Sequence, residues 1–210
     1  MEEVDAAGRL RAALDAPDSS ARVQAAMTAG THPHPTYVPV LVAQCRVEPE
    51  FLVREMLTWA LTRHDSEQVT DMLLVELGSR GAQVRSQALH TLSKIGGPRV
   101  WAAITTALLT DADDQVARVA WRTAARTAPE SEKAALARTL ATQFARGERE
   151  TRRSLSEAFA TLGELAAPVV ERAREEGGPY VSAHATITAT MMTDPDLTFA
   201  DAELAIADPA

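Results

Sequence analysis

Apolar and small residues recur along this chain at steps of three and four, which is the spacing of one face of an α-helix. Val84, Ala88, Leu92 and Ile95 show the spacing most clearly. Glycine and proline residues interrupt it at intervals that suit short helices, and several prolines stand where a helix would start, their preferred position. No segment alternates apolar and polar residues for more than a few positions, as a half-buried strand would. The pattern predicts an all-α protein.

One short pattern occurs six times along the sequence. A residue pair opens a helix, and a small or apolar residue follows four positions after the first member of that pair. Successive copies lie roughly 30 to 35 residues apart, the spacing expected of stacked helix pairs. The opening pairs are Ala21-Arg22, Val53-Arg54, Val84-Arg85, Val116-Ala117, Thr151-Arg152 and Val181-Ser182, and the later residues are Ala25, Leu57, Ala88, Ala120, Leu155 and Ala185.

We therefore predict six helix pairs and one last helix, about thirteen helices in all, within a single domain over residues 1–210. The first helices run near 3–15, 36–46, 66–78, 98–110, 130–146 and 165–176. The second helices run near 19–29, 51–63, 82–95, 114–127, 149–162 and 179–192, and the last helix near 198–207. This gives repeats near 3–30, 35–64, 66–96, 98–128, 130–163 and 165–193, with a cap at 197–208.

The segment from Val84 to Gly96 resembles the second helix of a HEAT repeat, with a Val-Arg start, small residues in mid-helix, and then a leucine and a closing glycine. The amino-acid sequences of segments 56–64 and 85–95 also resemble those of small actinobacterial HEAT-repeat proteins. The sixth copy departs from the pattern, because Ser182 stands in place of the arginine. The resemblance implies a right-handed α-solenoid whose second helices line a concave face.

The amino-acid composition limits the kinds of partner and the cellular location that we expect for this protein. The formal net charge of −8 means that the molecule as a whole would repel nucleic acid and anionic membranes. Cys45 is the single cysteine, which excludes an internal disulfide, and we expect it to be a thiol in the core. Residues 1–16 lack the apolar stretch of a signal peptide, and no run of 18 apolar residues occurs. We expect a soluble cytoplasmic protein.

The predicted second helices carry most of the positive charge. They hold eleven lysines or arginines against four acids, which makes them +7 in a chain of net charge −8. Arginines that follow the opening valine, such as Arg54, commonly form a structural ladder with acids in the turns of adjacent repeats. Without that ladder the surplus falls to +3 and rests on Arg118, Arg122 and Arg126, which are spaced four apart on one helix face. Such a row either binds a ligand or is paired with acids.

The positions two and six residues after each opening residue share a helix face that the core residues do not occupy. In the middle repeats this face combines an aromatic ring, a histidine and several charges, which could bind a protein segment or a small anionic or aromatic ligand. The alternatives are that Trp59 packs between helices and that His90 faces solvent. The predicted binding residues are Glu55, Trp59, Arg85, Ser86, His90, Arg118, Arg122, Arg153 and Glu157.

No catalytic motif, cofactor-binding loop or metal-ligand pattern occurs in the sequence. We therefore expect a non-enzymatic binding or scaffold module with a protein or peptide partner, possessing no cofactor, and acting as the sensor or adaptor part of a regulatory system. HEAT-like DNA glycosylases suggest a second hypothesis, in which Trp59, Trp121 and Asp114 would lie at the site that holds the damaged base. A third hypothesis is a structural assembly protein with an empty groove.

Overall fold

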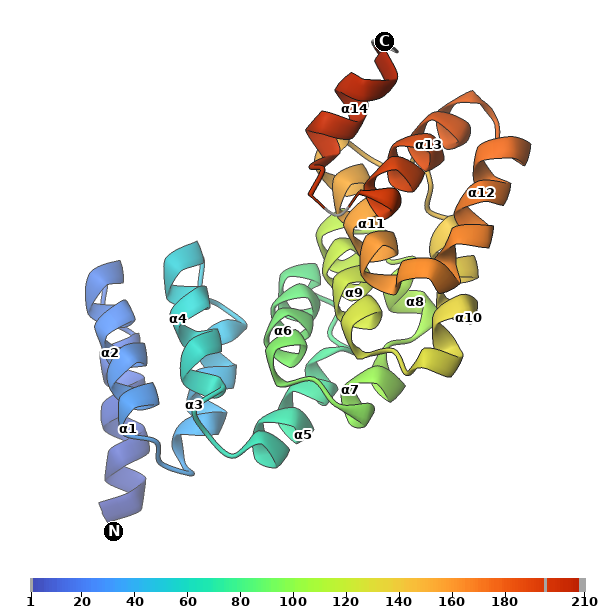
Figure 1. Ribbon diagram of the computed structural model, residues 1–210. Helices are drawn as coiled ribbons and strands as arrows, with labels where there is room; N and C mark the ends of the chain where they lie inside the picture. The colour runs from blue at the N-terminus through green and yellow to red at the C-terminus, as the bar shows by residue number, and fades with distance from the viewer. Residues whose placement is uncertain (1, 195, 208–210) are drawn as a thin grey trace. The chain divides into compact units, whose positions relative to one another are not determined.

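The computed structural model describes residues 2–194 and 196–207, and every regular element in those ranges is a helix. This confirms the predicted all-α class. The chain divides into two compact units that meet in sequence at Gly96 and Gly97. The predicted single domain stays a prediction, and the units are described separately. Figure 1 labels the helices of both.

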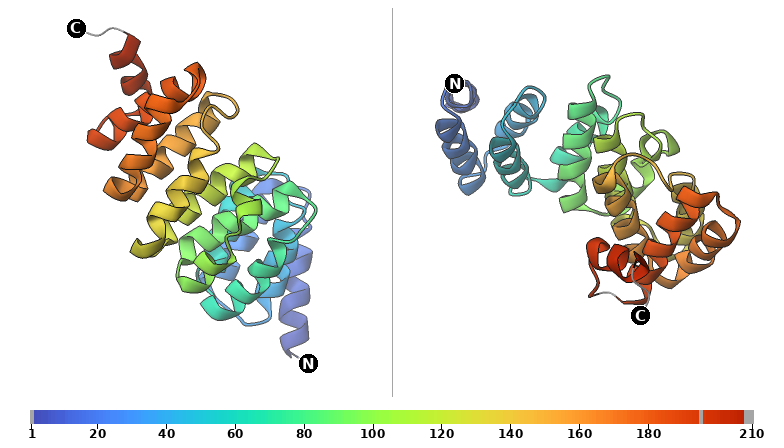
Figure 2. Two further views of the ribbon diagram at one scale, coloured as in Figure 1. Left: turned by 90° about the vertical axis from the view of Figure 1, so that its right-hand side faces the viewer. Right: turned by 90° about the horizontal axis from the view of Figure 1, so that it is seen from above.

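The first unit contains three helix pairs. Within each pair the helices pack on one another, and the second helices α2, α4 and α6 also contact one another in that order, as do the first helices α1, α3 and α5. The unit therefore has two layers, and in Figure 2 its α2 and α4 run side by side. The bounds are α1 Glu2–Leu14, α2 Ser19–Thr31, α3 Tyr37–Cys45, α4 Phe51–Leu61, α5 Ser66–Glu76 and α6 Ala82–Ile95.

The second unit repeats this layering. Its second helices α9, α11 and α13 pack in order, α8, α10 and α12 pack behind them, and α14 packs on α13. The bounds are α7 Pro98–Ala103, α8 Thr106–Leu109, α9 Asp114–Thr127, α10 Glu130–Ala141, α11 Arg149–Leu162, the 3₁₀ turn η1 Gly163–Ala166, α12 Ala167–Glu176, α13 Pro179–Thr193 and α14 Phe199–Ala207. The predicted cap is thus present as α14, although residue 208 of its predicted range lies outside the described residues.

Side-chain caps start several of these helices. Asp18 accepts a hydrogen bond from the Ala21 N–H at 3.1 Å, and Asp113 accepts one from the Val116 N–H at 3.1 Å. Each satisfies a backbone donor that the helix itself cannot pair, and its negative charge is favourable at the helix N-terminus. The residues four positions after the helix openings, from Ala25 to Ala185, are all buried, as the repeat pattern requires.

Two predicted helices are shorter than expected. The helix predicted over 98–110 is broken between α7 and α8, because Thr105 is extended and its hydroxyl caps α8 by accepting from the Leu108 N–H at 3.4 Å. The helix predicted over 130–146 ends at Ala141. Ala145 and Gly147 then adopt left-handed φ angles of 65° and 64°, which a continuous helix cannot contain. The first prediction missed an interior break, and the second placed the end of the helix too late.

Candidate functional site

The predicted binding residues are divided between the two units. Glu55 and Trp59 lie on α4, and Arg85, Ser86 and His90 lie on α6, all in the first unit. The other four belong to the second unit. Arg118 and Arg122 lie on α9, and Arg153 and Glu157 lie on α11.

In the first unit, the Glu55 and His90 side chains are in contact between α4 and α6. The Glu55 Oε1 atom lies 3.0 Å from His90 Nε2, and both side chains are partly exposed. Ser86 is turned back on its own helix, where its hydroxyl donates to the Gln83 carbonyl at 3.1 Å. The structure thus brings the carboxylate and the imidazole together, whereas the serine hydroxyl is used locally.

Trp59 has both a packing role and an exposed surface. A Cβ atom added at Gly30 of α2 would overlap the indole ring and would lie 2.9 Å from Ala60 Cα. The ring therefore covers Gly30 at the junction between α2 and α4, which is the packing alternative considered for this residue. Its side chain nevertheless remains 40% exposed. Replacing Trp59 would change packing as well as surface, so it is a poor probe of binding alone.

Three of the arginines that follow a helix opening have a common structural role. Each guanidinium donates from Nη1 to the two carbonyls that lie five and six residues earlier, in the turn before its own helix. Because hydrogen bonds from charged donors are strong, this contact fixes the turn. The three sets are Arg22 with Ala16 and Pro17, Arg54 with Glu48 and Pro49, and Arg85 with Ser79 and Arg80.

Glu48 adds an ion pair to this arrangement. Its carboxylate is buried and accepts from Arg22 Nε at 2.9 Å and Nη2 at 2.8 Å. Burial raises the pKa of Glu48, but hydrogen bonds from Arg22, Gln44 and the Glu50 N–H outweigh it and leave the pKa below its usual value. The predicted ladder between repeats therefore exists at Arg22, and Arg54 and Arg85 share its contacts with the backbone carbonyls of the preceding turn.

In the second unit, α9 and α11 share a row of alternating charges. Glu150 accepts from Arg118 Nη2 at 3.4 Å and from Arg153 Nη2 at 2.9 Å. Arg153 Nη1 also lies 3.5 Å from a Glu157 oxygen, and Arg118 Nε donates to Ser154 at 2.9 Å. Three of the predicted residues in this unit therefore belong to one connected network, in which the positive charge is partly balanced by acids.

Arg122 and Arg126 line a small cavity of about 200 Å³ between α9 and α11. Its remaining lining comes from α11 and includes Glu157 and Thr161. Both arginines are exposed, and Arg126 forms no ion pair with any residue that the structure describes. The fourth predicted residue of this unit thus lies beside the charged network.

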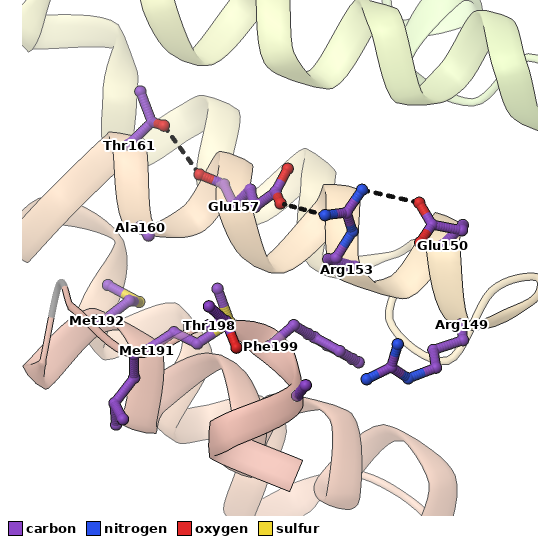
Figure 3. A pocket seen from close by; sticks show the side chains of 12 residues that line it. Arg149, Glu150, Arg153, Glu157, Ala160, Thr161, Met191, Met192, Thr198 and Phe199 are labelled. Atoms are coloured by element: carbon purple, nitrogen blue, oxygen red, sulfur yellow. Dashed lines mark hydrogen bonds and ion pairs between the residues drawn. The ribbon is translucent and has the colours of Figure 1, made fainter.

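A larger crevice of about 550 Å³ lies on the other side of Glu157 and Thr161, between α11, α13 and the start of α14. Figure 3 shows its two unlike walls. Arg153, flanked by Glu150 and Glu157, lies on the α11 wall, while methionines and Phe199 lie on the opposite wall. The full lining is Arg149, Glu150, Arg153, Glu157, Ala160, Thr161, Met191, Met192, Leu197, Thr198, Phe199 and Ala200.

The apolar wall was not recognised from the sequence. Met191, Phe199 and Ala202 form a buried cluster that joins α13 to α14. Phe199 was assigned only to a cap, and the Thr-rich sequence of α13 carries little periodic signal. The repeat pattern could not have located this wall, because α14 lies outside the repeats and its docking position is a tertiary property.

A cavity of about 430 Å³ is also present in the first unit, between α1 and α2 and beside Tyr37. Its lining combines five alanines and Leu10 with five polar residues, which are Arg9, Gln24, Thr28, His32 and Tyr37. None of the nine predicted residues lines it. The crevice of the second unit is lined by two of them, Arg153 and Glu157, so it is the stronger candidate.

His184 and Ser156 form a buried pair that resembles a nucleophile and its base. The Ser156 hydroxyl lies 3.1 Å from His184 Nε2. However, the Ala145 N–H donates to Nδ1 at 3.0 Å, so the proton resides on Nε2, which donates to the Arg152 carbonyl at 3.0 Å. Burial lowers the pKa of His184 to about 4. With Nε2 protonated and Ser156 fully buried, this arrangement is structural.

Over the described residues, no cluster of three histidine, cysteine or acidic side chains could hold a metal ion. In the same part of the chain, no helix combines the length and apolar character needed to cross a membrane. Cys45 is buried near the end of α3, and burial raises its thiol pKa to about 12, which agrees with the predicted core thiol.

Comparison with known proteins agrees with the helix-pair architecture. Residues 44–125 match the family model for HEAT repeats, and this segment of the chain is therefore HEAT repeat, as its sequence predicted. The match runs from the end of α3 into α9.

One solved structure, described as an engineered protein from the Northeast Structural Genomics Consortium, is similar with a TM-score of 0.47 and 17% sequence identity. The similarity covers 89% of this chain and 96% of that one. No curated protein matches the chain.

Proposed function

We propose that this protein is a non-enzymatic binding module or scaffold that holds a segment of a partner protein on the second helices of its second unit. HEAT repeats generally mediate protein interactions, and this supports the broad class. The observation that carries the specific proposal is the crevice of about 550 Å³, which places a charged helix opposite an apolar wall. Protein segments are bound by this combination, with apolar anchors for affinity and charges for orientation.

The predicted residues take different parts in this proposal. Arg153 and Glu157 line the crevice, and Arg122 lines the adjoining cavity. Arg118 supports them through Glu150. Glu55, Trp59 and His90 would form a separate surface on the first unit, whereas Arg85 and Ser86 serve local structure.

The glycosylase hypothesis is weakened by the two residues it would need in the second unit. Trp121 is fully buried, and its indole N–H donates to the Leu109 carbonyl at 2.7 Å. Asp114 accepts from Arg146 Nε at 2.8 Å. A buried ring cannot stack on an extruded base, and a paired carboxylate is a poor general base.

A small anionic or aromatic ligand is the second candidate, since the volume of the crevice falls within the usual range for small-molecule sites. Whether the crevice binds a protein segment or a small ligand, we propose that the protein acts in the cytoplasm as the adaptor or sensor part of a regulatory system. A structural assembly role without a ligand would leave the crevice empty.

The proposal is tested by capture from a lysate of the native cells, with retained proteins identified by mass spectrometry. Ala160 is exposed and lines the crevice, so Ala160→Trp would fill it. Ala135→Trp adds the same ring to an exposed position of α10 outside the crevice, and it is the matched control. We expect a partner that is retained by the wild type and by Ala135→Trp but lost from Ala160→Trp. Equal retention by all three would contradict the proposed site, and retention of nothing by any of them would favour the small-ligand or assembly alternatives.

A further inference from the structure

The second unit already holds one amphipathic acidic helix, its own α14. Phe199 of that helix is 2% exposed and packs with Met191 of α13. Four residues later, Glu203 accepts from Arg149 Nε of α11 at 2.8 Å. Because residues four apart lie on the same helix face, one face of α14 offers an apolar ring and a carboxylate together. The unit therefore shows how it holds such a helix.

The crevice beside α14 offers the same two features again. Its apolar side continues through Met192 and Leu197, both of which are partly exposed. On the opposite side are Arg149, whose side chain is 51% exposed, and Arg153, whose side chain is 43% exposed. Arg149 uses Nε and Nη2 for Glu203, so its Nη1 can donate hydrogen bonds to a further carboxylate.

The charge of this face also favours an acidic partner. The exposed side of α9 and the crevice side of α11 carry five arginines, at positions 118, 122, 126, 149 and 153, against Glu150 and Glu157 on α11 and Glu203 on α14, which pairs with Arg149. The chain as a whole has a net charge of −8. A local positive surplus on an acidic protein attracts anionic segments to that face and repels them elsewhere.

We propose that the crevice binds an amphipathic acidic helix of a partner protein, which places a large apolar side chain against Met192 and Leu197 and a carboxylate on Arg149 or Arg153. This rests on the proposed function and names the chemistry of its partner. The occupant resembles α14 in chemistry, but it lies beside α14 and does not replace it.

The test uses the full chain and a fluorescein-labelled peptide that copies Phe199–Ala207, stapled so that it is helical in solution. Short free peptides are rarely helical in water, and stapling removes that cost. Two matched peptides are compared with it. One carries lysines in place of Asp201 and Glu203, and the other carries alanine in place of Phe199. Binding is measured by fluorescence anisotropy at several salt concentrations.

We expect the acidic peptide to bind, and both altered peptides to bind at least about tenfold more weakly. Ala160→Trp should weaken binding of the acidic peptide at least about tenfold, and Ala135→Trp should leave it unchanged. Added salt should weaken binding, because the contacts are ionic and partly exposed. Equal binding of the acidic and lysine peptides, or no binding of the acidic peptide, would overturn the proposal.

Displacement of α14 by the peptide is distinguished by hydrogen exchange. If the peptide occupied the position of α14, exchange in α14 would rise on binding and Ala160→Trp would have no effect, which would overturn the crevice assignment. The proposed function is judged independently by the capture experiment. A partner lost from Ala160→Trp together with a non-binding acidic peptide would leave the function standing and refute only the acidic-helix partner.

Discussion

Two junctions between second helices, one in each unit, use the same three repeat positions for a buried polar contact. Between α4 and α6, Gln87 Nε2 donates to Thr58 at 2.8 Å, and Thr58 lies 3.0 Å from the Thr91 hydroxyl. Between α11 and α13, Ser156 lies 3.1 Å from His184 Nε2 and 2.7 Å from the Thr188 hydroxyl. In both cases these residues are five, three and seven positions after the helix openings.

The difference between the junctions lies in one residue, glutamine in the first unit and histidine in the second. Gln87 has no charge to gain. His184 is 2% exposed, and its Nδ1 accepts from the Ala145 N–H, so protonation would both bury a charge and break that hydrogen bond. In these two junctions the same repeat positions bring polar groups together, and we expect the residue at one of them to decide whether the junction responds to acid.

The largest expected effect is a loss of stability of the second unit in mild acid. The folded-state pKa of His184 is about 4, below its ordinary value of 6.5. Between these two pH values the imidazole is protonated in the unfolded chain but not in the folded chain. The contribution of neutral His184 to the free energy of unfolding is therefore complete above about pH 6.5 and is lost as the pH falls toward 4. It amounts to about 3 kcal/mol in full, of which about 2 kcal/mol should be lost between pH 7 and pH 5. Hydrogen exchange resolved by peptide at several pH values measures this in each unit.

His184→Gln tests whether this histidine causes the acid sensitivity, because it gives the junction of the second unit the residue type found in the first. Its stability at neutral pH should fall by about 1 kcal/mol, because the new side chain fits the three partners less well. Its stability should then change little between pH 7 and pH 5. A variant that kept the full acid dependence would show that another group is responsible.

A third junction, between α2 and α4, provides the next test. Its corresponding positions are apolar, and the helices approach closely at Gly30 under Trp59. Gly30→Ala should therefore destabilise the first unit by about 1 to 3 kcal/mol through overpacking. Gly8→Ala on α1 has open space around it and should instead stabilise by up to about 1 kcal/mol. Chemical denaturation of both variants measures the two changes, and a neutral or favourable Gly30→Ala would refute the close approach.

Gln87→His should transfer acid sensitivity to the first unit. Gln87 is 8% exposed, so burial of the new imidazole is less complete than that of His184. We expect a loss of about 1 kcal/mol between pH 7 and pH 5, confined to α4 and α6 in hydrogen exchange. The measurement stays above the range in which Glu48 titrates, because its pKa is below the usual carboxyl value. Unchanged acid behaviour would mean that the junctions are not equivalent.

The smallest effect is expected at Ala145, whose φ of 65° is unfavourable for a residue with a Cβ. Ala145→Gly should relieve that strain and stabilise the second unit by up to about 1 kcal/mol, while it keeps the N–H that His184 accepts. Comparing the thermal unfolding of this variant with that of the wild type measures the change in stability. Destabilisation would show that the alanine methyl has a packing role that exceeds the backbone cost.

Most of the fold could be predicted because the repeat leaves a local signal. The small or apolar residue four positions after each helix opening is readable without tertiary information, and so are the acids Asp18 and Asp113, each of which directly precedes its helix. The break inside the helix predicted over 98–110 and the early end of the helix predicted over 130–146 could not be read from the sequence. At the break, Thr105 provides a competing cap, and beyond the early end the Ala145 N–H donates to His184 of a distant helix.

The candidate site was less predictable. The charged face of α9 and α11 follows from helix periodicity, and it supplied Arg122, Arg153 and Glu157. The apolar wall depends on where α14 docks, which no repeat position encodes. Arg85 and Ser86 both belong to the predicted binding residues, yet both donate to nearby backbone carbonyls, a competition that spacing alone does not reveal.

The most direct test of the account is hydrogen exchange of the full chain with and without the partner retained in the capture experiment. We expect slower exchange on binding in α11, in the C-terminal part of α13 and at the start of α14, with the first unit little changed. Protection confined to α2, α4 and α6, or to the first-helix layer, would contradict the assignment of the binding site to the crevice.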